Sequence, residues 1–158
     1  MGNVVRQSAK TQNPVVISYG AEGNVWPDNA LFLSHNTLIS DYAKGAWFLR
    51  IPQDKFPSPP KVLAINNLTV GLGVFALGSI GQFDGNYPAL PSMLANPDMM
   101  DFTLSGNSPL RDLGVTPGRF ASKEDRLAPT AEFSLPIGTR RLDPPQKWTP
   151  GAFQTMQQ

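Results

Sequence analysis

The sequence predicts an all-β fold, a sandwich or a barrel, with long loops and an extended arm at each end. Several short segments alternate apolar and polar residues with the period of two that is typical of strands. The chain also contains 16 prolines, most of them from Pro57 onward, and proline interrupts helices and central strands alike. With 41% apolar residues, the chain has enough material for a hydrophobic core.

The first third of the chain is expected to supply strands to that core. In chain order we expect a polar arm over residues 1–13, strands over 15–19 and 30–33, a short helix or a strand over 37–44, and a strand over 47–51. Trp47 is expected in the core because it lies in the last of these alternating strands.

The middle of the chain predicts a hairpin. Residues 62–65 and the segment from Leu68 onward are apolar, and Asn66-Asn67 between them tolerates the positive φ of a tight turn. Period-two alternation then predicts one buried strand face, made of Leu68, Val70, Leu72, Val74 and Ala76. Gly71 and Gly73 on the other face leave room for another backbone to approach closely.

The last half is rich in loops and ends in an arm. Residues 122–125 favour one helical turn, and residues 131–137 favour a strand that Pro136 confines to a sheet edge. We find no internal repeat. We therefore divide the chain into an N-terminal arm (1–13), a β-rich core domain (14–128), and an edge strand with an extended C-terminal arm (129–158).

The charge balance argues against nucleic acid and membrane surfaces as partners. The chain has 13 Lys and Arg against 12 Asp and Glu, so no broad electrostatic attraction to an anionic surface is expected. The uncharged run over residues 62–83 contains asparagines and four glycines, which favour buried strands over a spanning helix. The absence of cysteine excludes disulfides and thiolate metal sites.

Tests for chemistry in the sequence are negative, and we predict no catalytic, cofactor-binding or metal-binding residues. His35 is the single histidine, and although Ser34 and Asp41 are near it in sequence, adjacent strand residues point to opposite faces. Asp98 and Asp101 favour a turn, because no calcium-loop spacing accompanies them. The stretch 71–76 matches a dinucleotide-binding glycine pattern but continues the strand alternation where a helix would have to begin.

Large side chains outside the expected core are candidates for contacts with other proteins. Residues 138–158 are too polar and proline-bearing to fold alone, yet they carry isolated aromatic side chains that could anchor in a partner. The candidate contact residues are Trp26, Phe133, Leu135, Arg140, Arg141, Trp148 and Phe153.

The Gly- and Pro-rich middle of the chain and the arm from Arg140 to Gln158 resemble the auxiliary virion proteins of tailed bacteriophages. These include capsid decoration (cement) proteins and small neck or tail components. The resemblance is one of style, and it implies a non-enzymatic structural protein of a virion, assembled in the host cytoplasm. It also implies that the partners are other protein subunits, including copies of this chain. The alternative is a monomeric β-sandwich that binds carbohydrate through exposed aromatic residues such as Trp26 and Tyr87.

Overall fold

The computed structural model describes residues 1–77, 80–119, 127–134 and 137–156. Its strands are β1 (Val4–Gln7), β2 (Val15–Ser18), β3 (Ala30–Ser34), β4 (Thr37–Ser40), β5 (Ala46–Arg50), β6 (Lys61–Ile65), β7 (Leu68–Val70), β8 (Gly73–Leu77), β9 (Gln82–Asp84), β10 (Tyr87–Ala89), β11 (Leu94–Asn96), β12 (Asp101–Leu104), β13 (Ala131–Phe133) and β14 (Thr139–Arg141). Its helical segments are the short 3-10 turns η1 (Gln53–Lys55), η2 (Pro91–Met93), η3 (Pro97–Met99) and η4 (Pro117–Arg119). The predicted all-β class is confirmed.

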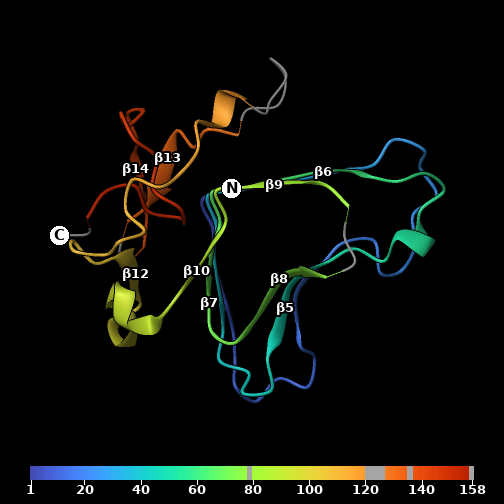
Figure 1. Ribbon diagram of the computed structural model, residues 1–158, viewed down its shortest axis with the longest axis horizontal. Helices are drawn as coiled ribbons and strands as arrows, with labels where there is room; N and C mark the ends of the chain where they lie inside the picture. Colours follow the sequence, from blue (N-terminus) through green and yellow to red (C-terminus); the bar gives the residue numbers. More distant parts are fainter. Residues whose placement is uncertain (78–79, 120–126, 135–136, 157–158) are drawn as a thin grey trace.

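The first ten strands form a stack of rungs, and each full rung supplies one strand to each of three sheets. The strand orders are β1-β4-β7-β10 in sheet A, β2-β5-β8 in sheet B, and β3-β6-β9 in sheet C. All pairings in these sheets are parallel. Figure 1 shows strands of successive rungs lying over one another as the sides of an open coil, the arrangement of a parallel β-helix.

This topology differs from the finer expectations. The three sheets do not close into a barrel, and a sandwich is not shown. Each sheet instead grows by one strand from each successive full rung. The predicted hairpin is wrong: β6 and β7 flank Asn66-Asn67 but belong to different sheets. Residues 37–40 form a strand, which settles the helix-or-strand alternative. Residues 4–7, expected in an arm, form β1. The helical turn expected at 122–125 lies outside the described residues.

Every strand of sheet A begins after the same two-residue corner. Gly2, His35, Asn66 and Gly85 have φ values of 68°, 52°, 53° and 63°, and each is followed by an asparagine and then by the strand. The left-handed conformation lets the chain turn sharply out of sheet C, and glycine and asparagine adopt it at least cost. These corners are an internal repeat that the sequence analysis missed.

The four corner asparagines, Asn3, Asn36, Asn67 and Asn86, form a hydrogen-bonded ladder. Each of the first three donates its backbone N–H and its side-chain Nδ2 to Oδ1 of the asparagine in the next rung, at 2.8–3.1 Å. Asn67 Nδ2 also donates to Leu33 O, and Asn86 Nδ2 to Ala64 O. The ladder satisfies polar groups that burial at the corner would otherwise leave unpaired.

The two central strands of sheet A are buried on both faces. Leu38 packs inside the coil with Ala46 and Phe48, whereas its neighbour Ile39 packs outside with Phe102 and Phe153. All residues of β4 and β7 are therefore buried, polar ones included. The rest of the coil interior is filled mainly by Leu31, Leu33, Leu49, Ile51 and Val62.

The predicted core face of residues 68–76 is correct only at its start. Leu68 and Val70 are buried, but Leu72 is 66% exposed and Val74 is 46% exposed. The chain turns at Gly71 (φ 112°), where an added Cβ would lie 2.1 Å from Ser40 O, so the alternation crosses a corner between two sheets. Trp47 is half-buried, and the neighbouring Phe48 takes the core position.

The chain after β10 covers the outer face of sheet A. The antiparallel pair β11–β12 contributes Leu94, Phe102 and Leu104 to the shared core, and the tail contributes Ala152 and Phe153. Backbone contacts tie the tail to the corners: Ala152 N donates to Thr37 Oγ1, and Gly151 N donates to Asn66 O. Residues 148–154 thus pack into their own chain, although we expected them in an extended arm.

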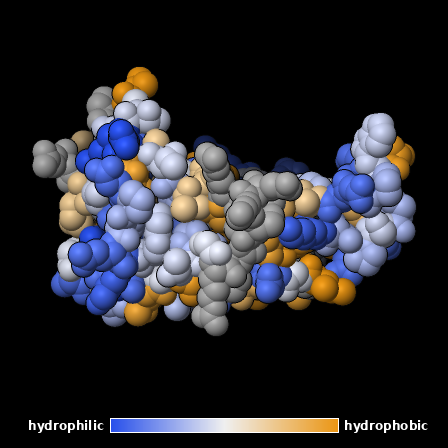
Figure 2. All heavy atoms as spheres, turned by 90° about the horizontal axis from the view of Figure 1, so that it is seen from above, coloured by the Kyte–Doolittle hydropathy of each residue, from blue (hydrophilic) through white to orange (hydrophobic). Residues whose placement is uncertain are grey.

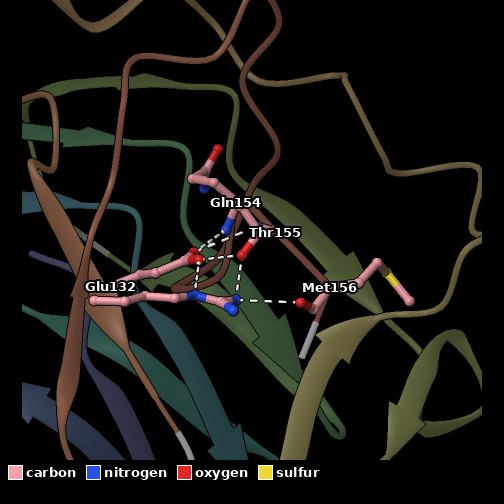
Figure 3. Close-up of polar contacts among 5 residues, drawn as sticks. Glu132, Gln154, Thr155 and Met156 are labelled. Atoms are coloured by element: carbon pink, nitrogen blue, oxygen red, sulfur yellow. Dashed lines mark hydrogen bonds and ion pairs between the residues drawn. The ribbon is translucent and has the colours of Figure 1, made fainter. Parts of the chain in front are cut away.

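The hairpin β13–β14 fastens the end of this tail through a buried carboxylate. Glu132, which is 2% exposed, accepts hydrogen bonds from Gln154 N at 2.6 Å and from Arg140 Nε at 2.7 Å (Figure 3). Thr155 donates to the same carboxylate through its N–H and its hydroxyl, and Arg140 Nη2 donates to Met156 O. In β13, Glu132 is therefore buried, while Ala131 is exposed and Phe133 is partly buried against the shared core.

We predict that Asn67→Ala lowers the free energy of unfolding by about 2–4 kcal/mol, because it leaves buried partners on two neighbouring rungs unpaired. Chemical denaturation measures the difference. Asn107→Ala is the matched control: this exposed asparagine makes one side-chain contact, with Ser105, and its loss should cost no more than about 0.5 kcal/mol. Equal losses for the two variants would contradict the ladder's role.

We predict that Phe153→Ala costs about 3–5 kcal/mol, the usual loss for a buried phenylalanine. Ile137→Ala is the control, since Ile137 is 91% exposed. A Phe153→Ala protein as stable as the wild type, by the same denaturation measurement, would show that the tail is not part of this core.

Candidate interaction surfaces

A groove of about 630 Å³ runs between the first rung and the C-terminal region. Its lining comprises Gly2, Asn3, Val4, Arg6, Met99, Met100, Phe102, Phe133 and Phe153. Segments from both ends of the sequence thus meet in one hollow. Met99 and Met100 are exposed at its wall, and Met100 has a positive φ of 65°. Flexible methionine side chains suit a surface that adapts to apolar groups of another molecule.

The groove follows the open edge of sheet A. Thr37 N donates to Asn3 O and Asp41 N donates to Gln7 O, so alternate residues of β1 direct their main-chain groups towards β4. By the same alternation, the main-chain groups of Val4 and Arg6 point away from β4. The groove therefore combines an apolar lining with strand-edge hydrogen-bonding groups, which is the combination that accepts extended peptide.

Arg6 is the ionisable side chain in the lining. Its guanidinium lies 5.9 Å from the centre of the Phe102 ring and donates to Asp41 Oδ2 at 2.9 Å. Both partners of this ion pair are partly exposed, so the pair fixes the side chain more than it stabilises the fold. The rest of the lining formed by described residues is mainly apolar, which suits binding.

A second surface lies at the other end of the rung stack. Its exposed apolar side chains come from the third rung and its corners: Leu72, Val74, Leu77, Ile80 and Phe83. Figure 2 shows hydrophobic residues reaching the surface along the lower edge of that view, among hydrophilic ones. We call this surface the third-rung end. The strands of the first rung, β1 to β3, expose no large apolar side chain in this way, although the loop between β2 and β3 exposes Val25 and Trp26.

The predicted contact residues are spread over different environments. Phe133 and Phe153 line the groove, where Phe153 is buried and Phe133 half-buried. Trp148 is buried, and its backbone O accepts from Gly114 N. Arg140 holds the tail, and Arg141 is exposed.

The other two predicted contact residues are Trp26 and Leu135. Trp26 is 71% exposed in the loop between β2 and β3. Leu135 lies outside the described residues. Within the chain as described, the aromatic side chains of the tail are thus occupied by intramolecular packing. The groove residues Arg6, Met99 and Met100 were not anticipated, because the fold assembles them from distant segments.

His35 is a buried structural residue with fully matched partners. Asn66 accepts from Val115 N and donates to Val115 O, both at 2.7 Å, which fixes the orientation of its amide. Asn66 Nδ2 therefore faces His35 Nε2 at 3.0 Å as a donor, and the ring proton is placed on Nδ1. Nδ1 lies 2.7 Å from Ser34 Oγ, which in turn donates to Leu127 O. The Trp148 ring packs 4.8 Å away.

The expected separation of Ser34 and His35 is wrong. Ser34 and His35 do contact each other, because the positive φ of His35 breaks the alternation of a regular strand. Both side chains are fully buried, however, and Asp41 is bonded to Arg6. Burial lowers the pKa of His35 from 6.5 to about 3, which keeps the imidazole neutral. The pair has neither substrate access nor a third member, so its geometry gives no catalytic triad.

The other motifs of the sequence fall into plain structural positions. Residues 73–77 form β8, a strand where dinucleotide binding would need a helix. Asp98 lies in the short helix η3. Within the described ranges, no cluster of three or more histidine, aspartate or glutamate side chains is placed to hold a metal ion. No helix in the same ranges is both long and apolar enough to cross a membrane.

We predict that His35 makes folding stability depend on pH. Because its folded pKa of about 3 lies below the unfolded value of 6.5, the unfolded chain binds the extra proton between these limits. The contribution of His35 to the free energy of unfolding is complete above pH 6.5. As the pH falls below 6.5, the free energy of unfolding decreases by up to about 1.4 kcal/mol per pH unit. His35→Asn keeps a residue that tolerates positive φ, as Asn66 does one rung later. The variant should lose this slope in denaturation measured across the interval, and equal slopes would contradict the assignment.

Comparison of the chain with known proteins finds no matching family model, no matching curated protein and no matching solved structure. The functional argument therefore rests on the surfaces described above.

Proposed function

We propose that this chain is a structural protein of a large assembly, a virion component such as a capsid decoration protein or a small neck or tail protein. It acts through contacts with other protein subunits, among them copies of itself. The observation that carries the proposal is the third-rung end. Terminal repeats of a stacked fold need a polar outer face to stay soluble, whereas here Leu72 and Ile80 are 66% and 67% exposed. An apolar surface of this kind marks a site that another protein covers.

The groove supports the same proposal from the opposite end of the stack. It joins an open strand edge at β1 to apolar side chains, so a second protein contact is available far from the first. A subunit that links neighbours needs at least two such surfaces. The virion itself is proposed from the resemblance of the Gly- and Pro-rich middle of the chain to auxiliary phage proteins.

Carbohydrate binding is the second candidate, and Trp26 favours it. This indole is 71% exposed beside Pro27, and Pro27 helps to line a hollow of about 370 Å³ together with Asp28, Asn29 and Lys61. An exposed ring next to amide and charged groups suits stacking on a sugar. Tyr87, the other aromatic considered for this role, is instead half-buried against the sheet A core and donates to Leu113 O.

The proposed function predicts that Leu72→Asp folds normally but no longer joins its assembly. An exposed position tolerates the substitution, so the melting temperature should stay close to that of the wild type. Binding to the source particle, measured by co-sedimentation, should weaken about tenfold or more, since a lost contact of about 1.4 kcal/mol has that effect. Ile80→Asp should behave in the same way.

Val25→Asp is the control for this experiment, because Val25 is 87% exposed in the loop between β2 and β3 and receives the same substitution. It should be incorporated like the wild type. Normal incorporation of both Leu72→Asp and Ile80→Asp would contradict the assembly role of the third-rung end. Glycan binding by the isolated chain that disappears in Trp26→Ala would instead support the second candidate.

A further inference from the structure

The third-rung end has the shape of a step. Sheet A contains four strands, while sheets B and C contain three each. β10 therefore adds a fourth layer to sheet A alone, next to β7. Within the described residues, the fourth-layer positions beside β8 and β9 are unfilled. The chain leaves the coil after β10 to form the C-terminal region, as Figure 1 shows.

The main chain at this step presents open hydrogen-bonding groups. Ala46 N donates to Leu72 O, so the alternation along β8 directs Val74 and Ala76 towards β5 and directs Gly73 and Phe75 away from it. In the same way, Asn66 N donates to Asp84 O, which leaves the main-chain groups of Phe83 facing away from β6. Among the strands described, neither β8 nor β9 has a second neighbour.

A second copy stacked along the same axis does not fit this step. Strand β1 of the second copy would lie beside β10, because β10 already occupies the fourth layer of sheet A. Its strands for sheets B and C would then lie two layers from β8 and β9, about 9.6 Å instead of the 4.8 Å needed for strand pairing. The step instead matches a single layer of extended chain that runs beside β8 and then β9.

We propose that an extended segment of a different protein fills the fourth layer and pairs in parallel with β8 and β9. Its main chain bonds to Gly73, Phe75 and Phe83, and its apolar side chains cover Val74, Leu77 and Ile80. The inference rests on the proposed function, for which it names the kind of partner.

Charge gives the segment a direction as well. β8 carries no ionisable side chain, whereas β9 ends in the exposed carboxylate of Asp84. A basic residue in the segment is therefore placed towards β9, beyond the part that covers β8. A segment that pairs in parallel has the same N-to-C direction as β8 and reaches β9 after β8. This basic residue therefore lies on the C-terminal side of the segment.

The test uses the purified full chain and a synthetic peptide with the sequence of residues 46–51, extended by two lysines for solubility. This sequence already pairs in parallel with β8 from the other side. At millimolar peptide, amide exchange followed by NMR should slow about tenfold at Gly73 and Phe75. Phe83, which the short peptide does not reach, should be unchanged, and native mass should show one chain. The same peptide with proline in place of Phe48 should give no protection.

Two results would overturn the inference. One is unchanged exchange at Gly73 and Phe75 at millimolar peptide. The other is a concentration-dependent dimer that protects both amides without peptide, which would make a second copy the occupant. Because no particle is present, these results are independent of the incorporation experiment. Loss of particle binding in Leu72→Asp combined with unprotected amides would retain the assembly role and reject strand addition.

Discussion

Asn36 and Asn67, at the corner between sheets C and A, each accept two hydrogen bonds from the asparagine of the preceding rung and donate two to the asparagine of the next. Three separate sheets are kept in register by this one column, since every strand of sheet A starts directly after it. The loops elsewhere can then differ in length, because the successive links of the ladder span 33, 31 and 19 residues. The two middle asparagines, Asn36 and Asn67, are buried, so water competes little for the bonds between them.

The C-terminal region depends on the same corners. Thr37 and Asn66 hold the tail through its backbone, and the His35 ring packs against Trp148. Burial of the outer face of sheet A by this region separates the two surfaces that remain open. The groove lies at the first rung, and the third-rung end lies where the stack stops. The outer face of sheet A is thus covered, whereas the surfaces at the two ends of the rung stack are exposed.

Local patterns in the sequence predict a strand at β2, β3, β5 to β8 and β13, because period-two alternation reports burial on one face whichever sheet a strand joins. The strands β1, β9 to β12 and β14 lie where arms or loops were expected. Pairing could not be predicted in the same way. Asn66 has the positive φ expected of a turn, yet the turn leads into another sheet. Period-two alternation happens to continue past the corner at Gly71, so the pattern wrongly placed Leu72 in the core. At His35 the positive φ breaks the alternation, so two neighbours expected on opposite faces contact each other. Phe153 was taken as an anchor for a partner because nothing local indicates that its pocket lies in the same chain. The groove has no sequence signal, since four distant segments build it.

The order of the core has a consequence for synthesis on the ribosome. The rungs are complete once β10 has emerged, but the outer face of sheet A needs residues 94–104 and then Ala152 and Phe153 to cover it. A nascent chain therefore carries an incompletely covered apolar sheet face until Ala152 and Phe153 have emerged, at the stage when exposed strands are most prone to misassociation. Because the contacts that cover this face, such as that between Thr37 and Ala152, are among the farthest apart in sequence, they form late, and the ladder must hold the rungs together until then.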